Sequence, residues 1–361
     1  MKLRPKPEMP LTLRCLLTMA LAVIALVSQH PRAEPLYRLE SALSIRSAAA
    51  PDWDYLTFDP VRSYLYIARR GDGILIYDAK AKKIVGGVQN STGGNATALV
   101  PEFDRGYTAN LDGSTTIFQL STSKTIGRFK FGESADSIFF DPVTKQLLVT
   151  MGDSKAAAFL DARTGALAGR LEIDSESLEG TAPDGQGDFF MALRDRNKVI
   201  RIDARARKVT AEWKSEGCEL PTGLAYDKES KRIMVGCRGQ HPVLAVMDAE
   251  SGRVIATPEI GRGNDFVAFD GETHKIYTSN GVDGNLVIID QLDANTYKLA
   301  EATTTRPYAR TMALDAKTKN VYLVTAEGTV DASKPWKRAV SPFYPNTYFK
   351  DTFTLLTYTR K

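Results

Sequence analysis

The chain has 361 residues, of which 43% are apolar and 25% are charged, and its formal net charge is +4. This composition is typical of a soluble globular protein and excludes disordered, collagen-like and multi-span membrane proteins. At roughly 150 residues per domain, the length fits either two domains or one large all-β unit. The net charge comes entirely from residues 1–33, so the remainder is close to neutral and favours no particular partner.

The N-terminal segment has the pattern of an export signal. Basic residues up to Arg14 precede an apolar run from 16 to 27, and small and polar residues follow it. This run is shorter than the roughly 20 residues that a transmembrane helix needs, and Cys15 is placed too early for lipid attachment. We therefore expect cleavage near residue 33, a periplasmic or secreted location, and a single domain over residues 34–361.

The body of the chain is repetitive. An apolar segment that closes on an acidic or proline turn recurs at Asp59, Pro101, Asp141, Pro183, Asp227, Asp270 and Asp315. Neighbouring copies are 40 to 45 residues apart. Each unit contains three further β-rich runs, such as SYLYIAR at 63 and ILIYDA at 74 in the first unit, so that four short strands repeat. A period just above forty with four strands per unit is typical of propeller blades.

The seven units predict an all-β, seven-bladed β-propeller of four-stranded antiparallel blades. The last unit ends in TFTLLTYTRK at 352–361 and lacks a fourth strand, whereas PLYRLESALSI at 35–45 has no blade of its own. We expect the N-terminal strand to pair with the outside of the last blade, because this closes the ring without leaving an unpaired edge.

Two cysteines, Cys218 and Cys237, remain after the expected processing. An even pair in an exported chain indicates a disulfide. The alternative is two buried free thiols.

A second distinctive stretch is an insertion at 327–351 in the last blade, which we expect to overhang one end of the ring. It interleaves cations with aromatic rings and contains Trp336, Lys337, Arg338 and Tyr344. Cations beside flat rings can hold bases, sugars or a loop of a partner. The alternative is that these rings fold back on the propeller as a small satellite core.

Several segments resemble a known family, namely CELPTGLAYD at 218, GRGNDFVAFD at 261, YTSNGVDGNLVIID at 277 and ARTMALDAKTKNVYLVTAE at 309. They are similar to the exported seven-bladed propellers of the YVTN-repeat, YncE type, and the resemblance spans nearly the whole processed chain. It implies a periplasmic binding-type propeller without an agreed enzymatic activity, with single-stranded DNA as one partner. The insertion at 327–351 departs from the proline-rich insert of these relatives.

Strand direction predicts where a site would lie. In an antiparallel blade the start of the first strand, the end of the second and the start of the third share one end, so one mouth of the channel collects these loops. Loops on a rigid frame commonly carry binding residues. The candidates for ligand binding at this mouth are Trp53, Asp54, Arg69, Asn95, Asn110, Asp136, Glu179, Arg194, Thr222, Arg238, Asp265, Asn280 and Arg310.

These residues favour a monomeric binding protein over an enzyme. Guanidinium groups such as those of Arg238 and Arg310 suit a small anionic ligand, and an envelope protein or single-stranded DNA are the other partners considered. The competing interpretation is that the polar groups serve solvation and hydrogen bonding between blades.

Catalytic motifs are scarce, so we expect no catalytic residue, no metal and no cofactor. One enzyme alternative is a lactonase-like hydrolase with a divalent cation held by oxygen ligands. Glu179, Asn264, Asp265, Asp52 and Asp54 supply suitable residue types for it.

Overall fold

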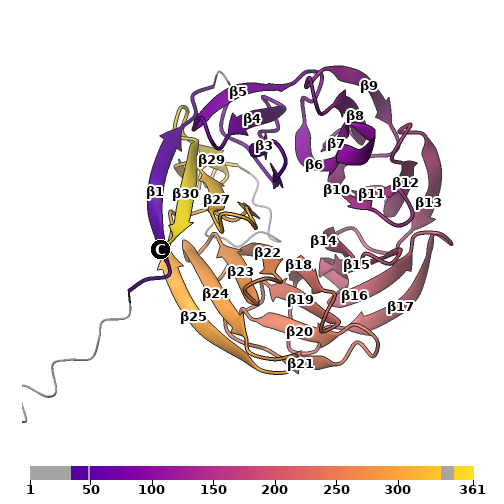
Figure 1. Ribbon diagram of the computed structural model, residues 1–361, viewed down its shortest axis with the longest axis vertical. Helices are drawn as coiled ribbons and strands as arrows, with labels where there is room; N and C mark the ends of the chain where they lie inside the picture. The colour runs from indigo at the N-terminus through magenta and orange to yellow at the C-terminus, as the bar shows by residue number, and fades with distance from the viewer. Residues whose placement is uncertain (1–33, 48, 335–344) are drawn as a thin grey trace, which may run out of the picture. The chain divides into compact units, whose positions relative to one another are not determined.

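Each sequence repeat folds into one twisted antiparallel sheet, and the sheets follow one another around a ring (Figure 1). The structure is a computed structural model that describes residues 34–47, 49–334 and 345–361. Within these residues there are seven four-stranded sheets, so the predicted seven-bladed propeller is confirmed. Tyr37–Lys361 form one compact unit. The expected export signal at 1–33 lies outside the described residues.

The strands of each blade run outward from the centre of the ring in chain order. Blades 1 to 3 comprise β2 Leu56–Asp59, β3 Tyr64–Ala68, β4 Ile74–Asp78 and β5 Lys83–Val88; β6 Gly94–Val100, β7 Arg105–Asn110, β8 Ser114–Gln119 and β9 Thr125–Lys130; and β10 Ala135–Asp141, β11 Gln146–Met151, β12 Ala156–Asp161 and β13 Leu167–Glu172. Blades 4 to 6 comprise β14 Leu178–Pro183, β15 Asp188–Leu193, β16 Lys198–Asp203 and β17 Lys208–Lys214; β18 Pro221–Asp227, β19 Arg232–Cys237, β20 Leu244–Asp248 and β21 Val254–Ala256; and β22 Asn264–Asp270, β23 Lys275–Asn280, β24 Asn285–Gln291 and β25 Tyr297–Thr304.

Blade 7 combines both ends of the propeller. Its strands are, from the centre outward, β26 Met312–Leu314, β27 Val321–Thr325, β30 Thr354–Arg360 and β1 Tyr37–Ser44. The pairing of β1 with β30 is antiparallel and confirms the predicted closure. The side chain of Tyr37 continues the closure into blade 6, since its hydroxyl lies 3.0 Å from the hydroxyl of Tyr277 and donates to the backbone oxygen of Lys319 at 2.8 Å.

The recurring aspartates cap the turns that follow the innermost strands. In blade 1, Asp59 Oδ1 accepts hydrogen bonds from the backbone N–H groups of Val61 at 2.9 Å and Arg62 at 3.2 Å. Asp270 accepts the equivalent bond from Glu272 at 3.2 Å. A short carboxylate satisfies turn N–H groups in this way, so these markers are architectural.

Apolar side chains fill the space between neighbouring blades. Leu148 and Phe159 of blade 3, for example, pack in one buried cluster with Phe189 and Met191 of blade 4. The inner and middle strands are mostly buried, whereas outer strands such as β13 alternate between half-buried and exposed positions. The sheets are therefore held face to face, and the ends of the inner strands are presented on a rigid frame.

Two further features of the chain match the sequence analysis. Cys218 and Cys237 form a disulfide with a Cα to Cα distance of 5.3 Å, which confirms the predicted bridge. The insertion separates β27 from β30 and contains a short hairpin, β28 Gly328–Thr329 with β29 Thr347–Tyr348. Trp336, Lys337, Arg338 and Tyr344 lie outside the described residues. No helix in the described part of the chain is long and apolar enough to cross a membrane.

The closure makes a direct prediction about stability. Deleting residues 34–44 removes β1 and buried Tyr37, and exposes the edge of β30. We expect a loss of several kcal/mol, which at about 2 °C per kcal/mol lowers the melting temperature by roughly 10 °C or more. Circular dichroism of this variant beside a chain that begins at Glu34 measures the difference. An unchanged melting temperature would contradict the closure.

The disulfide gives a second prediction. The bridge joins residues separated by 19 positions, and closing a loop of that size stabilises a protein by about 3 kcal/mol in the chain-entropy model. Replacing Cys218 and Cys237 together with alanine should lower the free energy of unfolding in urea by a similar amount. A change within error of zero would show that the bridge adds nothing to stability.

Candidate functional site

The polar residues predicted for the mouth lie where the pairing of the inner strands is irregular. In blades 2 to 6 the register between the first and second strands shifts at the start of the first strand. The residues at these shifts are Asn95, Asp136, Glu179, Thr222 and Asp265. A bulge re-aims side chains locally. The same irregularity therefore recurs at equivalent positions around the ring.

Blade 1 has an equivalent irregularity. The backbone N–H of Asp54 donates to the oxygen of Ala68 at 3.1 Å, while the N–H of Ala68 donates to the oxygen of Tyr55 at 3.1 Å. Two residues thus stand opposite one, as in a bulge. Arg70 follows β3 with a positive φ of 38° and turns toward these residues.

Glycines beside the polar residues allow the blades to approach closely. A Cβ atom at Gly180 would lie 2.3 Å from the backbone oxygen of Thr222 in the next blade. A Cβ atom at Gly223 would lie 2.8 Å from the carbonyl carbon of Phe266, one blade further on. Side chains at these two positions would push neighbouring inner strands apart. At 179–180 and 222–223 the sequence therefore places a polar residue directly before a glycine that lets the neighbouring inner strands approach.

The polar side chains join into a network that we call the mouth ring. It consists of Asp52, Asp54, Arg70, Asn95, Asp136, Glu179, Arg194, Arg238, Asp265 and Arg310. All seven blades contribute at least one member. The network therefore brings together residues that are up to 258 positions apart in the chain, from 52 to 310.

Arginines of blades 1, 7 and 5 contact the carboxylates of blades 1 and 6. Arg70 contacts Asp54 at 2.6 Å and Asp52 at 3.0 Å. Arg310 lies 3.5 Å from Asp54 and is also hydrogen bonded to Asp265, which in turn is paired with Arg238. Arg310 therefore connects blade 7 to blades 1 and 6, whereas Arg70 joins two carboxylates within blade 1.

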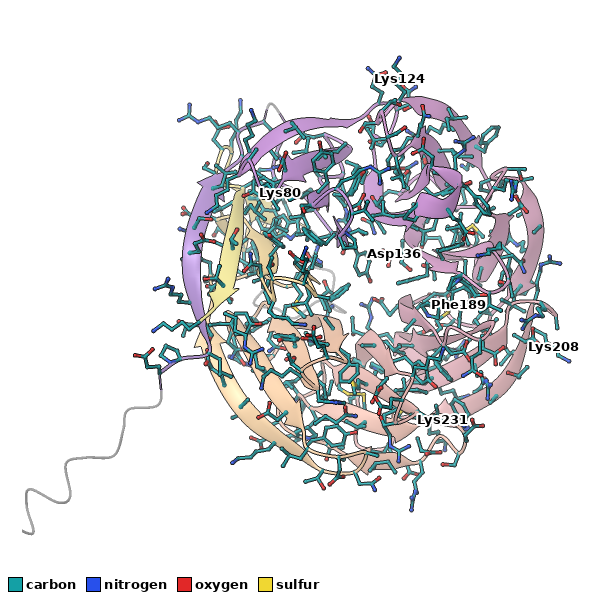
Figure 2. All side chains as sticks on the ribbon, viewed as in Figure 1. Lys80, Lys124, Asp136, Phe189, Lys208 and Lys231 are labelled. Atoms are coloured by element: carbon teal, nitrogen blue, oxygen red, sulfur yellow. A yellow bond between two sulfur atoms is a disulfide. The ribbon has the colours of Figure 1, made fainter. Side chains whose placement is uncertain are left out.

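Hydrogen bonds extend this network to blades 2 and 3, and blade 4 adds an ion pair of its own. Arg70 Nε donates to Asn95 Oδ1 at 2.7 Å, and Asn95 Nδ2 donates to Asp136 Oδ1 at 2.7 Å. In blade 4 Arg194 pairs with Glu179 at 2.7 Å. Figure 2 shows Asp136 on the inner side of the ring of blades.

Charges in the mouth ring are unequal, with five carboxylates and four guanidiniums. Within the described residues Asp136 is the ring carboxylate without an ion-pair partner, and its side chain is held by the amide of Asn95. Burial raises the pKa of Asp136 well above its ordinary value, and the nearby carboxylates of Asp54 and Glu179 raise it further. Among the described residues, Asp136 is therefore the carboxylate of the mouth ring whose charge is not paired with a guanidinium.

The other buried carboxylates differ from one another in the balance of burial and pairing. Burial raises the pKa of Asp54 and of Glu179, despite the opposing arginines. Burial would also raise the pKa of Asp265, but Arg238 and Arg310 outweigh it and hold that pKa below its ordinary value. Asp265 is thus the best neutralised carboxylate of the mouth ring.

Two aromatic side chains that the sequence analysis did not select lie beside the charges. The rings of Tyr55 and Phe266 meet edge to face with centroids 6.0 Å apart, although they come from blades 1 and 6. Burial raises the pKa of Tyr55 well above its ordinary value, and Asp136 is the next largest cause. The position of Tyr55 directly after Asp54 is the sequence signal that could have identified it.

Other predicted residues lie inside the blades. Asn110, Thr222 and Asn280 are fully buried and hydrogen bond within their own blades, Asn110 to Ser114 and Asn280 to Asn285, for example. Arg70, rather than Arg69 of the same loop, enters the mouth ring. Arg69 and Trp53 are both 1% exposed and lie under the insertion.

Several of the oxygen ligands that the hydrolase alternative requires are engaged in other contacts, although among the described residues Asn264 Oδ1 is buried without a hydrogen-bond partner. Asp265 is paired with two guanidiniums, and Asn264 Nδ2 donates to backbone oxygens of Phe266 and Ser279. In the part of the chain that the structure describes, no three histidine, cysteine or acidic residues gather as a metal site.

No protein-family model and no curated protein sequence matches the chain. Solved structures do match in fold. A chain in the crystal structure of the mitotic checkpoint complex is similar with a TM-score of 0.71 and 14% identity, over 99% of this chain and 96% of that chain. A chain of Kuenenia stuttgartiensis hydrazine synthase has a TM-score of 0.64 and 17% identity, over 77% of this chain and 94% of that chain.

Identities this low show the fold alone. The protein is a seven-bladed β-propeller.

The pKa of Asp136 predicts a pH-dependent stability. Its folded-state pKa lies above its unfolded value, so the favourable contribution of the protonated group is present at low pH and is lost as pH rises through the folded-state pKa. Asp136→Asn should therefore be more stable than the parent at pH 7, by about 1 kcal/mol or more, with the difference disappearing toward pH 4. Urea unfolding across this range, with exposed Asp174→Asn as control, measures the effect. A constant difference would contradict it.

Proposed function

We propose that this chain is an exported binding protein that captures a small polar ligand at the mouth ring, without covalent chemistry of its own. The observation that carries the proposal is the convergence of polar side chains from all seven blades, charged in all but blade 2, with Asp136 left uncompensated by a cation. The inner strands hold these groups on a rigid frame, which is the usual arrangement of a binding site. The resemblance to YncE-type propellers supports the same class of function.

The pairing within the mouth ring favours a ligand that donates hydrogen bonds there. Each arginine of the ring already faces a carboxylate, so an anion at these arginines would have to displace a largely buried ion pair. Breaking such a pair leaves an uncompensated charge and costs several kcal/mol. Asp136 can instead accept a bond from an amine or hydroxyl group. At the mouth ring, the proposal therefore replaces the small anionic ligand expected from the sequence with a small ligand that donates hydrogen bonds.

The same charge balance bears on the macromolecular partners. A strand of DNA requires a track of cations along its phosphates, whereas the mouth ring carries an excess of one carboxylate. An envelope protein could reach Asp136 only through a protruding lysine or hydroxyl side chain. We therefore place the small ligand first.

The proposed location outside the cytoplasm rests on the N-terminal sequence pattern. The disulfide between Cys218 and Cys237 supports it, because disulfides persist in oxidising compartments.

A thermal-shift screen tests the proposal. A chain that begins at Glu34 is screened against amines, sugars, nucleotides and oligonucleotides, because a ligand that binds only the folded state raises the melting temperature. We expect a hit among the amines or hydroxyl compounds. Titration calorimetry should then show at least tenfold weaker binding to Asp136→Asn, since a hydrogen bond to a charged group is worth about 1.5–3 kcal/mol.

Asp174→Asn is the matched control and should bind as the parent does, because Asp174 is 85% exposed and lies outside the mouth ring. Equal affinity of the parent and Asp136→Asn for the hit would contradict a site at this carboxylate. A hit among the oligonucleotides alone would favour the nucleic-acid partner instead.

A further inference from the structure

Trp53 and Arg69 lie beside the mouth ring, where blade 1 meets Phe353 of blade 7. The shifted pairing of Asp54 with Ala68 places them as cross-strand neighbours. Both side chains pack on Phe353, which lies just before β30. The guanidinium carbon of Arg69 is 4.0 Å from the centre of that ring, and the ring centroids of Trp53 and Phe353 are 5.6 Å apart.

These two side chains carry buried N–H groups that have no acceptor. The described residues contain seven buried side-chain nitrogen or oxygen atoms without a hydrogen-bond partner, and three of them are Trp53 Nε1, Arg69 Nε and Arg69 Nη1. The remaining nitrogen of the guanidinium, Nη2, lies 2.9 Å from Asp72 Oδ2. Asp72 also accepts a hydrogen bond from Ser47 through its other oxygen. One carboxylate thus serves the whole cationic group.

Such an arrangement is costly unless another group completes it. A buried donor without an acceptor destabilises the folded protein, and more so when the donor is charged. Native proteins leave few groups in this state, and a cluster of them indicates a missing partner. Asp72 Oδ2 is unpartnered as well, because its contact with Arg69 is an ion pair without hydrogen-bond geometry. Donors still outnumber acceptors at this place, so the fitting partner is a further oxygen with negative charge.

We propose that Trp53 and Arg69 form a subsite for an anionic oxygen group of the ligand, either a carboxylate or a phosphate. This inference rests on the proposed binding function of the mouth and adds a second chemical requirement to its ligand. It also separates Arg69 from the arginines of the mouth ring. Arg69 is also paired with a carboxylate, that of Asp72, but Nε and Nη1 of its guanidinium retain N–H groups without an acceptor.

Entry to this subsite requires part of the insertion to move. Trp53 and Arg69 are each only 1% exposed, and the ring of Tyr348 lies over Trp53 with centroids 4.9 Å apart. Tyr348 belongs to β29, which pairs with β28, and its ring covers that of Trp53. Tyr348→Ala should therefore accelerate anion entry without removing either donor.

Nuclear magnetic resonance of the ¹⁵N-labelled chain from Glu34 tests the subsite directly. The sequence has three tryptophans, Trp53, Trp213 and Trp336, whose indole N–H signals are assigned by single phenylalanine variants. Sodium acetate and sodium phosphate are the probes, with sodium chloride at equal ionic strength as reference. We expect a saturable shift of the Trp53 indole and the Arg69 Nε–H signals, with Trp213 unchanged. The stronger of the two probes distinguishes carboxylate from phosphate.

Arg69→Met should lose the response of Trp53, because methionine keeps the packing on Phe353 and removes the donors. Exposed Arg196→Met is the matched control and should keep it. The Arg69 Nε–H signal of the parent gives the same answer without any variant, should Arg69→Met fail to fold. Responses equal to those in sodium chloride would overturn the inference, and so would water cross-peaks at these donors that persist at saturating probe.

The two proposals fail separately. Asp136→Asn should retain the acetate or phosphate response of Trp53, since within the described residues Asp136 shares no hydrogen bond with Trp53 or Arg69. A missing anion response together with Asp136-dependent binding of a screened ligand would refute only the subsite. The converse result would refute only the role of Asp136.

Discussion

The pairing of β1 with β30 is the constraint on which the rest of the structure depends. It joins the two ends of the propeller into one sheet and thereby holds blade 7 between blades 6 and 1. Contacts across both junctions follow from it. Tyr37 reaches Tyr277 of blade 6, and Thr311 of blade 7 donates to the backbone oxygen of Asp54 at 2.8 Å. The mouth ring can form only because this closure brings Arg310 to Asp54.

A ring of buried charges is costly to assemble, and the geometry of the inner strands makes it possible. Bulges turn polar side chains toward one another, and glycines at 180 and 223 let the backbones come close. Several of these charges are then stabilised by a neighbour from another blade, as Asp265 is by Arg238 and Arg310. Such networks hold only when nearly every member is satisfied. The exceptions, Asp136 and the Trp53 and Arg69 pair, are for that reason the places where a ligand would complete the structure.

The fold could be read from the repeat because every blade repeats the same local chemistry. Aspartates such as Asp59 cap the same turn, and the orphan strand at the N-terminus matches the missing strand at the C-terminus. The location of the mouth followed from strand direction alone. Which side chains face it did not, because a shift of one residue reverses the face on which a strand side chain lies. Arg69 and Arg70 illustrate this, since they are adjacent in sequence but have different environments.

The sequence by itself determined the number of blades, the closing strand and the cysteine pair, since these depend on period, length and residue type along the chain. Tertiary structure alone decided the partners of each charge. Asp136 is left without a cation, whereas Asp265 has two guanidiniums, because their neighbours come from distant repeats. Tertiary structure also decided the contact between the rings of Tyr55 and Phe266, which belong to blades 1 and 6. Contacts of this kind depend on how the sheets pack around the ring, and no local pattern in a single repeat encodes that packing.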